Sequence, residues 1–430
     1  MPHAPRPAAF HIHSIAFAFP GNRDAIALRA PATDRLLSEH AEWIRQERSA
    51  PVAYVRGARP HIRVVFRRVT GPAKLTAIIG ASARGKIVGV AARRVQLAFG
   101  RNGLSQPVSF RLSKRLPSTV GVRRVRWRWT GEVGDLRVPL GDSEHEICLA
   151  WRRPRPAKAW AGVNDFKNHP DWVYAPVMQW TCAWAAGRKD PKEICDAILS
   201  HLPASGLSYA KPAWDVRSML STGGGYCGGW YRMFQAMAAA QGVAVERRSF
   251  LVDWQSESGG RARWCAIVVG KPGINRDSVA EAPSTFHDVL RRPVKEAPVR
   301  STTRARYRFW GVPEKLGDGH CVNFLRHSGR WYLYDACFLS RPVALPGFTL
   351  PRSNTTRAIP IGKLGAFRTR YLDQAVSYML GSFRQEGHLY RTVHPDPGDP
   401  GFGKQPVING LSIRTPIVPR PGELISFYWV

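Results

Sequence analysis

A cysteine set among glycines is the residue of this chain best suited to chemistry. Glycines occupy positions 223–225 and 228–229 on either side of Cys227, and apolar residues then recur at helical spacing from Trp230 to Ala238. This pattern predicts a helix with Cys227 at or just before its first turn. A thiol there lies near unpaired N–H groups and the positive end of the helix dipole, which favour the reactive thiolate. The competing interpretation is a buried cysteine beside a glycine turn.

A thiol nucleophile needs a base, and the base needs an acceptor that fixes its tautomer. His320 and Asp335 lie on two strand-like runs joined at Ser328-Gly329, which is a hairpin signal. A turn centred there places Val322 opposite Asp335, and His320 then lies on the same face as both. Diagonal neighbours of this kind are about 7–8 Å apart at their backbones. The sequence therefore predicts a triad in which Cys227 attacks, His320 is the base and Asp335 orients the histidine.

These segments together resemble the transglutaminase-like branch of the papain-like cysteine enzymes. The match covers roughly residues 175 to 340 and rests on GGGYCGGWYRMFQAMAAAQGVAV, GHCVNF and GRWYLYDAC. The resemblance implies the same triad on an α+β fold. Gly228-Gly229 and Cys321 depart from the family's pattern, which leaves the substrate class open.

The expected reaction is attack of the Cys227 thiolate on a carboxamide or peptide carbonyl of a protein or peptide substrate, through a thioester. The backbone N–H of Cys227 would hold the oxyanion, with Trp180, Trp184 or Tyr209 as candidates for an upstream donor. Water as acceptor makes an amidase, peptidase or deamidase, whereas a lysine amine makes a protein cross-linking transglutaminase. We favour hydrolysis because water needs no second binding site. No metal and no organic cofactor is required.

The net charge of +32, with 50 Arg among the 63 basic residues, favours anionic partners. Two alternatives follow from it: a cell-wall peptidoglycan amidase or endopeptidase, and a non-catalytic basic module that binds nucleic acid or a membrane. A third alternative is a purely structural scaffold. Arg124, Arg126 and Arg128 alternate with apolar residues, which predicts either a solvated strand face or a stripe that binds a polyanion.

The remaining composition restricts where the protein works. There are seven cysteines and no C-x-x-C pair, so reduced thiols are expected. No apolar run is long enough for a membrane span, and the first residues predict no secretory signal. We expect a bacterial protein that is cytoplasmic at synthesis, such as an effector or toxin exported by a signal-independent route. An inhibitory partner is left open.

Composition and periodicity predict a multidomain chain: a β-sandwich followed by an α+β papain-like or transglutaminase-like catalytic domain. The expected parts are an accessory β-sandwich at 10–155, a linker at 156–174, a catalytic domain at 175–345 with an insertion at 271–319, and a C-terminal extension at 346–430. One helix is expected within the first part, from Asp34 to Glu47. Another is expected in the last part, near Tyr371 to Leu380.

Overall fold

The structure, a computed structural model, describes residues 9–83, 88–155, 173–209, 213–225, 227–255, 261–269, 307–309, 320–336, 341–352, 355–372, 378–385, 388–392, 407–408, 411–412 and 424–429. For Cys227 and His320 it describes the backbone and not the side chain. The chain divides into two compact units. Unit 1 comprises Met1–Ala157, Gly162–Ile194 and Met237–Val243, and unit 2 comprises Lys158–Ala161, Cys195–Ala236 and Ala244–Val430.

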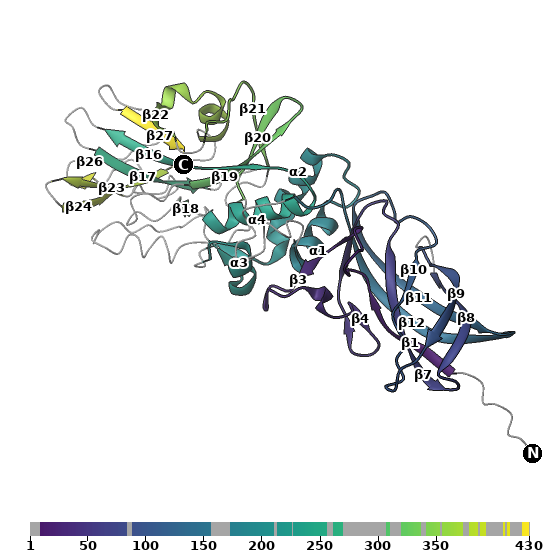
Figure 1. Cartoon of the computed structure of the whole chain (residues 1–430). Helices are drawn as coiled ribbons and strands as arrows, with labels where there is room; N and C mark the ends of the chain where they lie inside the picture. The colour runs from purple at the N-terminus through teal and green to yellow at the C-terminus, as the bar shows by residue number, and fades with distance from the viewer. Residues whose placement is uncertain are drawn as a thin grey trace, which may run out of the picture. The chain divides into compact units, whose positions relative to one another are not determined.

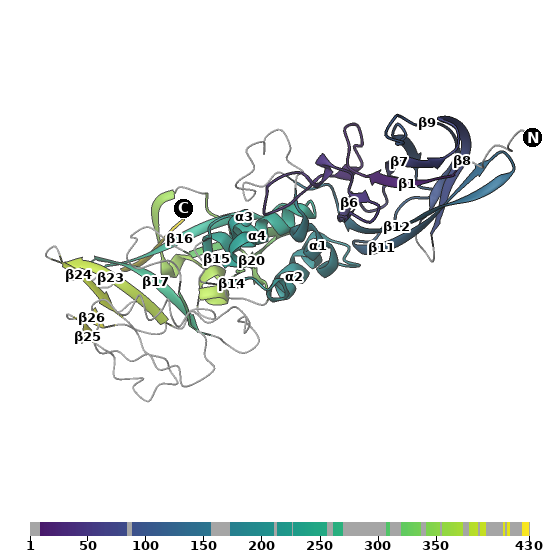
Figure 2. The same ribbon diagram turned by 90° about the horizontal axis from the view of Figure 1, so that it is seen from below.

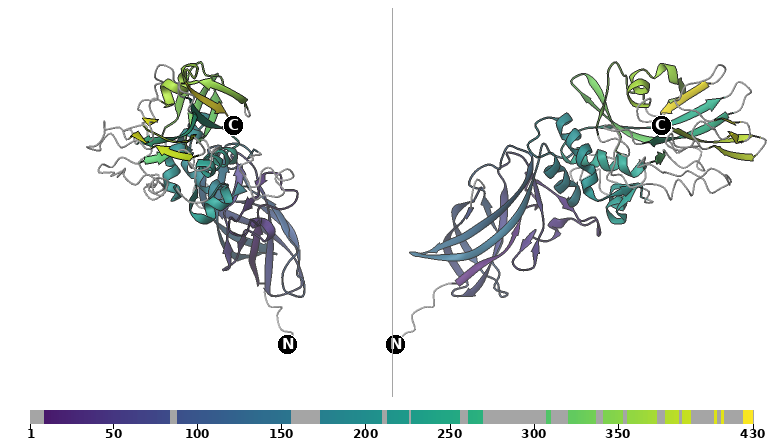
Figure 3. Two further views of the ribbon diagram at one scale, coloured as in Figure 1. Left: turned by 90° about the vertical axis from the view of Figure 1, so that its left-hand side faces the viewer. Right: turned by 180° about the vertical axis from the view of Figure 1, so that it is seen from behind.

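Unit 1 contains two sheets that enclose one hydrophobic core (Figures 1 and 3). Within the described residues, a five-stranded sheet has the order β10 (Val108–Arg111), β7 (His61–Thr70), β1 (Ala9–Ala16), β4 (Trp43–Ile44) and β5 (Arg48–Ser49). A six-stranded sheet has the order β2 (Ala25–Ile26), β6 (Val52–Val55), β12 (Leu136–Ala150), β11 (Gly121–Val133), β8 (Lys74–Ala83) and β9 (Val90–Ala98).

Strand β11 shows how the sequence builds this core. Val125, Trp127 and Trp129 are at most 3% exposed, whereas the arginines between them are exposed. Trp127 Nε1 donates to Val88 O at 3.0 Å, and Trp129 Nε1 donates to Ser143 Oγ at 2.9 Å. This burial pattern confirms the predicted alternation. Each buried indole also finds an acceptor for its N–H, as buried tryptophans usually do.

Unit 1 also includes helical segments that follow the sheets in sequence. The short strand β13 (Val173–Tyr174) pairs in parallel with β3 (Leu28–Arg29) and leads directly into α1 (Ala175–Trp184). Helix α2 (Pro191–His201) begins in unit 1 as predicted, because Asp190 Oδ1 accepts from the N–H groups of Lys192 and Glu193 at 2.8 and 3.0 Å.

Unit 2 begins with the rest of α2, the short 3₁₀ turn Leu202–Ser205 and the strand β14 (Ser208–Tyr209). Helices α3 (Val216–Thr222) and α4 (Cys227–Ala240) lie side by side, joined by β15 (Gly224–Gly225) (Figures 1 and 2). The last turn of α4 belongs to unit 1.

The rest of unit 2 is one large sheet. Its main path, within the described residues, is β21 (Val343–Leu345), β20 (Arg330–Tyr334), β19 (His320–His327), β16 (Glu246–Gln255), β17 (Arg261–Val269), β23 (Tyr378–Gln385) and β24 (His388–Thr392). Strands β18 (Tyr307–Phe309) on β17, β27 (Leu424–Trp429) on β16 and β22 (Thr355–Pro360) on β27 extend it. A separate small hairpin joins β25 (Val407–Ile408) to β26 (Leu411–Ser412).

Two helix predictions are wrong. The segment from Asp34 to Glu47 contains only a 3₁₀ turn at Leu37–Glu39 and then β4, because Trp43 pairs with Ile15 of β1 and is buried in the core. The segment near Tyr371 to Leu380 contains the end of a π-helix, Phe367–Leu372, and the start of β23.

The C-terminal residues also differ from the expected extension. Strand β27 pairs with β16 and β23 pairs with β17, so residues beyond 345 are built into the sheet that carries His320. Of the expected insertion at 271–319, only Tyr307–Phe309 lies within the described residues, and it pairs with β17. Of the expected linker at 156–174, all but Val173 and Tyr174 lies outside them.

Candidate active site

The backbone of Cys227 is the first residue of α4, as the glycine pattern predicts. Helix α3 ends at Gly223, which adopts φ +79°. This left-handed conformation favours glycine and lets the chain turn directly from α3 towards α4. No acidic residue lies in the first turn of α4, so no carboxylate there opposes the positive end of the helix dipole.

The glycines around Cys227 have a packing role of their own. A Cβ atom on Gly225 would lie 2.8 Å from Ala213 O, and one on Gly229 would lie 2.6 Å from the same oxygen. A Cβ atom on Gly228 would lie 2.5 Å from the ring of Trp214. Only glycine fits at such distances, so residues 213 and 214 run directly over the start of α4. Close packing accounts for these three glycines without any chemistry.

The hairpin that carries His320 and Asp335 has the predicted register. Asn323 pairs with Tyr334 and His327 with Arg330, around a turn in which Ser328 and Gly329 both have positive φ angles of 48° and 77°. Two positive φ angles are typical of a type I′ turn, whose twist matches that of the strands. Continuing this register by one pair sets Val322 opposite Asp335, as the sequence predicts.

Asp335 is fully buried, and its carboxylate has a tyrosine partner. Tyr371 Oη donates to Asp335 Oδ2 at 2.7 Å, and neither side chain is accessible to solvent. Tyr371 packs in turn against Phe250 and Phe367, with ring centroids 6.5 and 5.2 Å apart. The backbone of His320 pairs with Phe250 of β16. We call this side of the sheet, which also holds Phe324, the aromatic face.

Helix α4 packs against the opposite side of the same sheet, which we call the helix face. The rings of Phe234 and Tyr334 stack with centroids 5.1 Å apart, and the Arg247 guanidinium lies 5.6 Å from the centre of the Tyr231 ring. Burial, followed by the proximity of Cys195 and Asp196, raises the pKa of Tyr334, whose hydroxyl donates to Asp196 Oδ1 at 2.8 Å. The Asp335–Tyr371 hydrogen bond and α4 therefore contact opposite faces.

The direction of α4 along the sheet follows from two contacts. Gln235 Nε2 donates to Val245 O at 3.4 Å, and Tyr231 lies against Arg247, two residues further along β16. Residue numbers thus fall along α4 as they rise along β16. The N-terminus of α4 points along β16 towards Phe250, whose backbone pairs with His320 at the start of β19. The predicted nucleophile is the first residue of α4 and the predicted base is the first residue of β19, towards which this helix end points.

The three candidates for an upstream oxyanion donor separate in the structure. The backbone of Tyr209 pairs with Gly225, two residues before Cys227. Trp180 and Trp184 belong to unit 1, where their rings stack with centroids 5.9 Å apart. Only Tyr209 is placed beside Cys227 by its backbone pairing.

Sequence reasoning missed Tyr371 and Trp214. Tyr371 was assigned to a helix, and no local pattern links it to an acid 36 residues earlier. The sequence could have indicated the position of Trp214, because the next residue, Asp215, is the N-cap of α3. The Asp215 carboxylate accepts a hydrogen bond from Ser218 N at 2.9 Å. Trp214 is 43% exposed, which is unusual for an indole that covers a glycine-lined turn.

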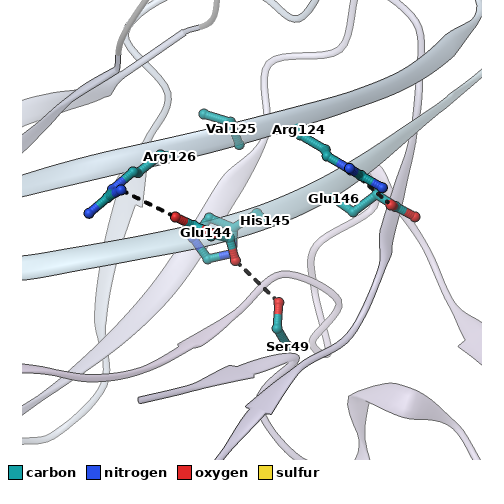
Figure 4. Close-up of a pocket in the computed structure, with 7 residues that line it drawn as sticks. All are labelled: Ser49, Arg124, Val125, Arg126, Glu144, His145 and Glu146. Atoms are coloured by element: carbon teal, nitrogen blue, oxygen red, sulfur yellow. Dashed lines mark hydrogen bonds and ion pairs between the residues drawn. The ribbon is translucent and has the colours of Figure 1, made fainter. Parts of the chain in front are cut away.

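A separate groove of about 380 Å³ lies on unit 1 and contains none of the predicted triad (Figure 4). Side chains that line it form ion pairs between neighbouring strands: Arg124 lies 3.7 Å from Glu146, and Arg126 lies 3.5 Å from Glu144. Ser49 Oγ donates to Glu144 O at 3.2 Å. The arginine stripe predicted from the sequence is thus matched by acidic side chains on β12.

Within the described residues, no group of three or more His, Cys, Asp and Glu side chains is arranged to hold a metal ion. No helix in the described part of the chain combines the length and apolar character that crossing a bilayer needs. No protein-family model matches the chain and no curated protein matches it significantly, so the resemblance to transglutaminase-like enzymes rests on its residues alone.

Proposed function

We propose that this protein is a cysteine acyl-transfer enzyme of the transglutaminase-like kind, with Cys227 as nucleophile, His320 as base and Asp335 as the group that orients the histidine. One observation carries the proposal: the register of β19 and β20 makes His320 and Asp335 diagonal neighbours, and the N-terminus of α4 points towards the start of β19, where His320 lies. The fold we propose for unit 2 is correspondingly an α+β papain-like one.

The proposed reaction uses groups of the chain alone. The Cys227 thiolate, favoured by the helix N-terminus, attacks the carbonyl carbon of a carboxamide or peptide bond. The Cys227 N–H and a donor near Tyr209 stabilise the oxyanion. His320 gives its proton to the leaving amine, and a thioester remains. Water then attacks the thioester, releasing the acid and restoring the thiol.

The mechanism has to account for the position of α4 and of the Asp335 carboxylate on opposite faces of the sheet. Because α4 contacts the helix face, the imidazole of His320 must reach the sulfur past the end of β19 rather than through the sheet. His320 is the first residue of that strand, so no earlier residue of β19 stands in between. Asp335 would share its carboxylate between Tyr371 and the histidine.

The test compares the full chain with its Cys227→Ala and Cys321→Ala variants. Each is incubated with a mixture of denatured proteins and with peptidoglycan fragments, and the products are identified by mass spectrometry. Conversion of amides to acids indicates deamidation, joined chains indicate transfer to lysine, and shortened chains indicate proteolysis. The proposal requires that one of these products forms with the wild type and the Cys321→Ala control, and not with Cys227→Ala. Cleavage of peptidoglycan fragments alone would identify a cell-wall amidase or endopeptidase.

The second candidate is a non-catalytic binding module, and the position of Asp335 favours it. Its carboxylate is already engaged by Tyr371, on the face opposite α4. This candidate predicts that Cys227→Ala leaves every biological activity of the protein unchanged.

A further inference from the structure

Three strands of the five-stranded sheet in unit 1, β1, β7 and β10, carry positive charge and no acidic residue. Strands β1 (AFHIHSIA), β7 (HIRVVFRRVT) and β10 (VSFR) contain four arginines and three histidines, and neither Asp nor Glu. Their alternate residues Ile12, Ile62, Val64, Phe66 and Phe110 are buried in the core. The intervening residues therefore point outward, and we call His11, His13, Arg63, Arg67 and Arg111 the basic face.

Two arginines of the basic face have histidines, and not acidic residues, as their cross-strand partners. Arg67 pairs directly across from His11, and Arg111 pairs across from His61. Among the ion pairs formed between described residues, none involves Arg63, Arg67 or Arg111. Because no ion pair among the described residues compensates these arginines, they leave a positive potential that an external anion would relieve.

The lowered pKa values of His11 and His13 are consistent with this positive potential. Partial burial and then the charges of Arg45, Arg67 and His13 lower the pKa of His11. Partial burial and Arg67 also lower the pKa of His13, and Glu47 is the one carboxylate that opposes this. An anion bound here would raise both pKa values, which couples binding to proton uptake.

The arginines on the six-stranded sheet of unit 1 can be compared with those of the basic face. Strands β11 and β12 contain five arginines, but Arg124, Arg126 and Arg128 each lie within 4 Å of an acidic side chain of β12. Arg126 donates to Asp142 Oδ2 from two nitrogens, at 3.0 and 2.7 Å. These arginines are neutralised within the protein, whereas those of the basic face are not.

We propose that the basic face binds the phosphate backbone of double-stranded nucleic acid, without preference for base sequence. The cations of this face that are charged at neutral pH are all arginines, whose planar guanidinium matches two phosphate oxygens at once. The residues between them have short side chains: Ser14, Ala16, Val65 and Ser109 leave room for a polymer backbone to approach the sheet. Arg63 and Arg67 are four residues apart along β7, which spans about 13 Å.

The apolar surface argues against other anionic partners. The large hydrophobic side chains exposed among the described residues of unit 1 are Val69, Ile78 and Leu136, and none is aromatic. Proteins that bind single strands stack bases on aromatic rings, and helices that lie on membranes insert aromatic and aliphatic side chains. A surface with charge but without such rings fits the outside of a duplex, where phosphate contacts alone supply affinity.

The experiment measures binding of a fluorescent DNA duplex to the full chain by anisotropy over a range of salt concentrations. The test variant is Arg67→Ser with Arg111→Ser, and the matched control is Arg124→Ser with Arg126→Ser. Both remove two positive charges, so a non-specific effect of net charge is equal in the two. We expect at least tenfold weaker binding for the test variant, with a salt slope reduced by about 2, and a change within twofold for the control. Thermal melting of both variants checks that unit 1 remains folded.

Equal losses in the two variants would overturn the proposal, as would a wild-type protein that does not bind the duplex at low salt. Retention of the wild type on phosphatidylserine vesicles, without duplex binding, would also overturn it and would identify a membrane surface as the partner. None of these outcomes depends on Cys227, so the result is independent of the proposed enzyme activity.

Discussion

The two units differ in whether a buried amide side chain has hydrogen-bond partners. In unit 1, Gln241 is fully buried and its amide is used completely: Oε1 accepts from Trp151 N at 2.9 Å, and Nε2 donates to Thr181 Oγ1 at 2.9 Å and contacts Cys182 Sγ at 3.3 Å. In unit 2, Asn323 is also fully buried, yet neither its oxygen nor its nitrogen has a hydrogen-bond partner among the described residues. Gln241 therefore links Trp151 to Thr181 through hydrogen bonds, whereas burial of the unpaired Asn323 amide lowers the stability of the fold.

Buried polar groups other than these amides do not divide cleanly between the units, because Tyr54 Oη of unit 1 also lacks a hydrogen-bond partner among the described residues. Glu42 of unit 1 accepts from the N–H groups of Phe17 and Ala18 at 2.8 and 3.0 Å. In unit 2, Trp230 Nε1 and Gln235 Oε1 on α4 lie buried without a partner among the described residues, as does Trp429 Nε1. Unsatisfied groups are therefore found in both units, and those of unit 2 lie on α4 and on the sheet that carries His320. Native proteins tolerate such costs mainly where function requires particular side chains.

The largest loss of stability at neutral pH is expected when the satisfied amide is removed. Gln241→Met should destabilise unit 1 by about 2–4 kcal/mol, because Trp151 N and Thr181 Oγ1 would each remain buried and lose a partner. Chemical denaturation of the full chain measures this loss. Gln235→Met on α4, which ends just before Gln241, is the matched control and should change stability by less than about 1 kcal/mol, because its one hydrogen bond is long at 3.4 Å. Equal losses would contradict the comparison.

A pH dependence of comparable size is expected from His145. This side chain is 4% exposed and packs between Phe17 and Trp127, and burial lowers the pKa of His145 from 6.5 to about 3. The unfolded chain takes up a proton below about pH 6.5 while the folded chain does not, so stability falls by about 1.4 kcal/mol per pH unit down to about pH 3. Unfolding of the wild type and of His145→Gln, compared from neutral to acidic pH, measures this slope. A slope that is the same in both proteins would show that His145 does not contribute.

A smaller loss is expected at the buried carboxylate of unit 2. Tyr371→Phe should destabilise the chain by about 1.5–3 kcal/mol, because a hydrogen bond to a buried charged acceptor is lost. Tyr231→Phe is the control: its hydroxyl accepts from Arg247 at 3.4 Å, and its loss should be marginal. A neutral Tyr371→Phe would mean that Asp335 does not depend on this tyrosine.

The smallest effect, and one of opposite sign, is expected for the unsatisfied amide. Asn323→Leu should leave stability unchanged or raise it by up to about 1–2 kcal/mol, because it removes two buried polar atoms without orphaning a described partner. Denaturation measured beside Gln241→Met gives the direct contrast. A loss as large as that of Gln241→Met would show that Asn323 has partners after all.

Local patterns predicted the parts of the molecule that are determined locally. The alternation around Val125 is confirmed because one face of β11 meets the core and the other meets water. The hairpin between His320 and Asp335 has the expected register because the turn at Ser328 and Gly329 permits few alternatives. The start of α2 is confirmed because Asp190 caps it from a neighbouring position.

The remaining features depend on contacts between distant residues. The pairing of Trp429 with Phe250 joins segments for which no local signal exists, and it carries the chain end into the sheet. Leu380 pairs with Cys265 of β17, and this pairing replaces the helix expected there. The face on which α4 packs is likewise a tertiary property, set by Phe234 against Tyr334, and it could not be predicted from the spacing of Cys227, His320 and Asp335.

The most direct test of the central claim is the alkylation rate of each cysteine by iodoacetamide, followed by peptide mapping, in the wild type, in His320→Ala and in His327→Ala. His327 lies at the far end of the same strand and serves as the control. The account predicts that Cys227 reacts fastest below the ordinary thiol pKa of about 8.5, that His320→Ala slows it at least about tenfold, and that His327→Ala does not. If Cys227 reacts at the rate of a thiol in the denatured chain, and His320→Ala leaves that rate unchanged, the sulfur and the imidazole do not meet and the proposed enzyme is contradicted.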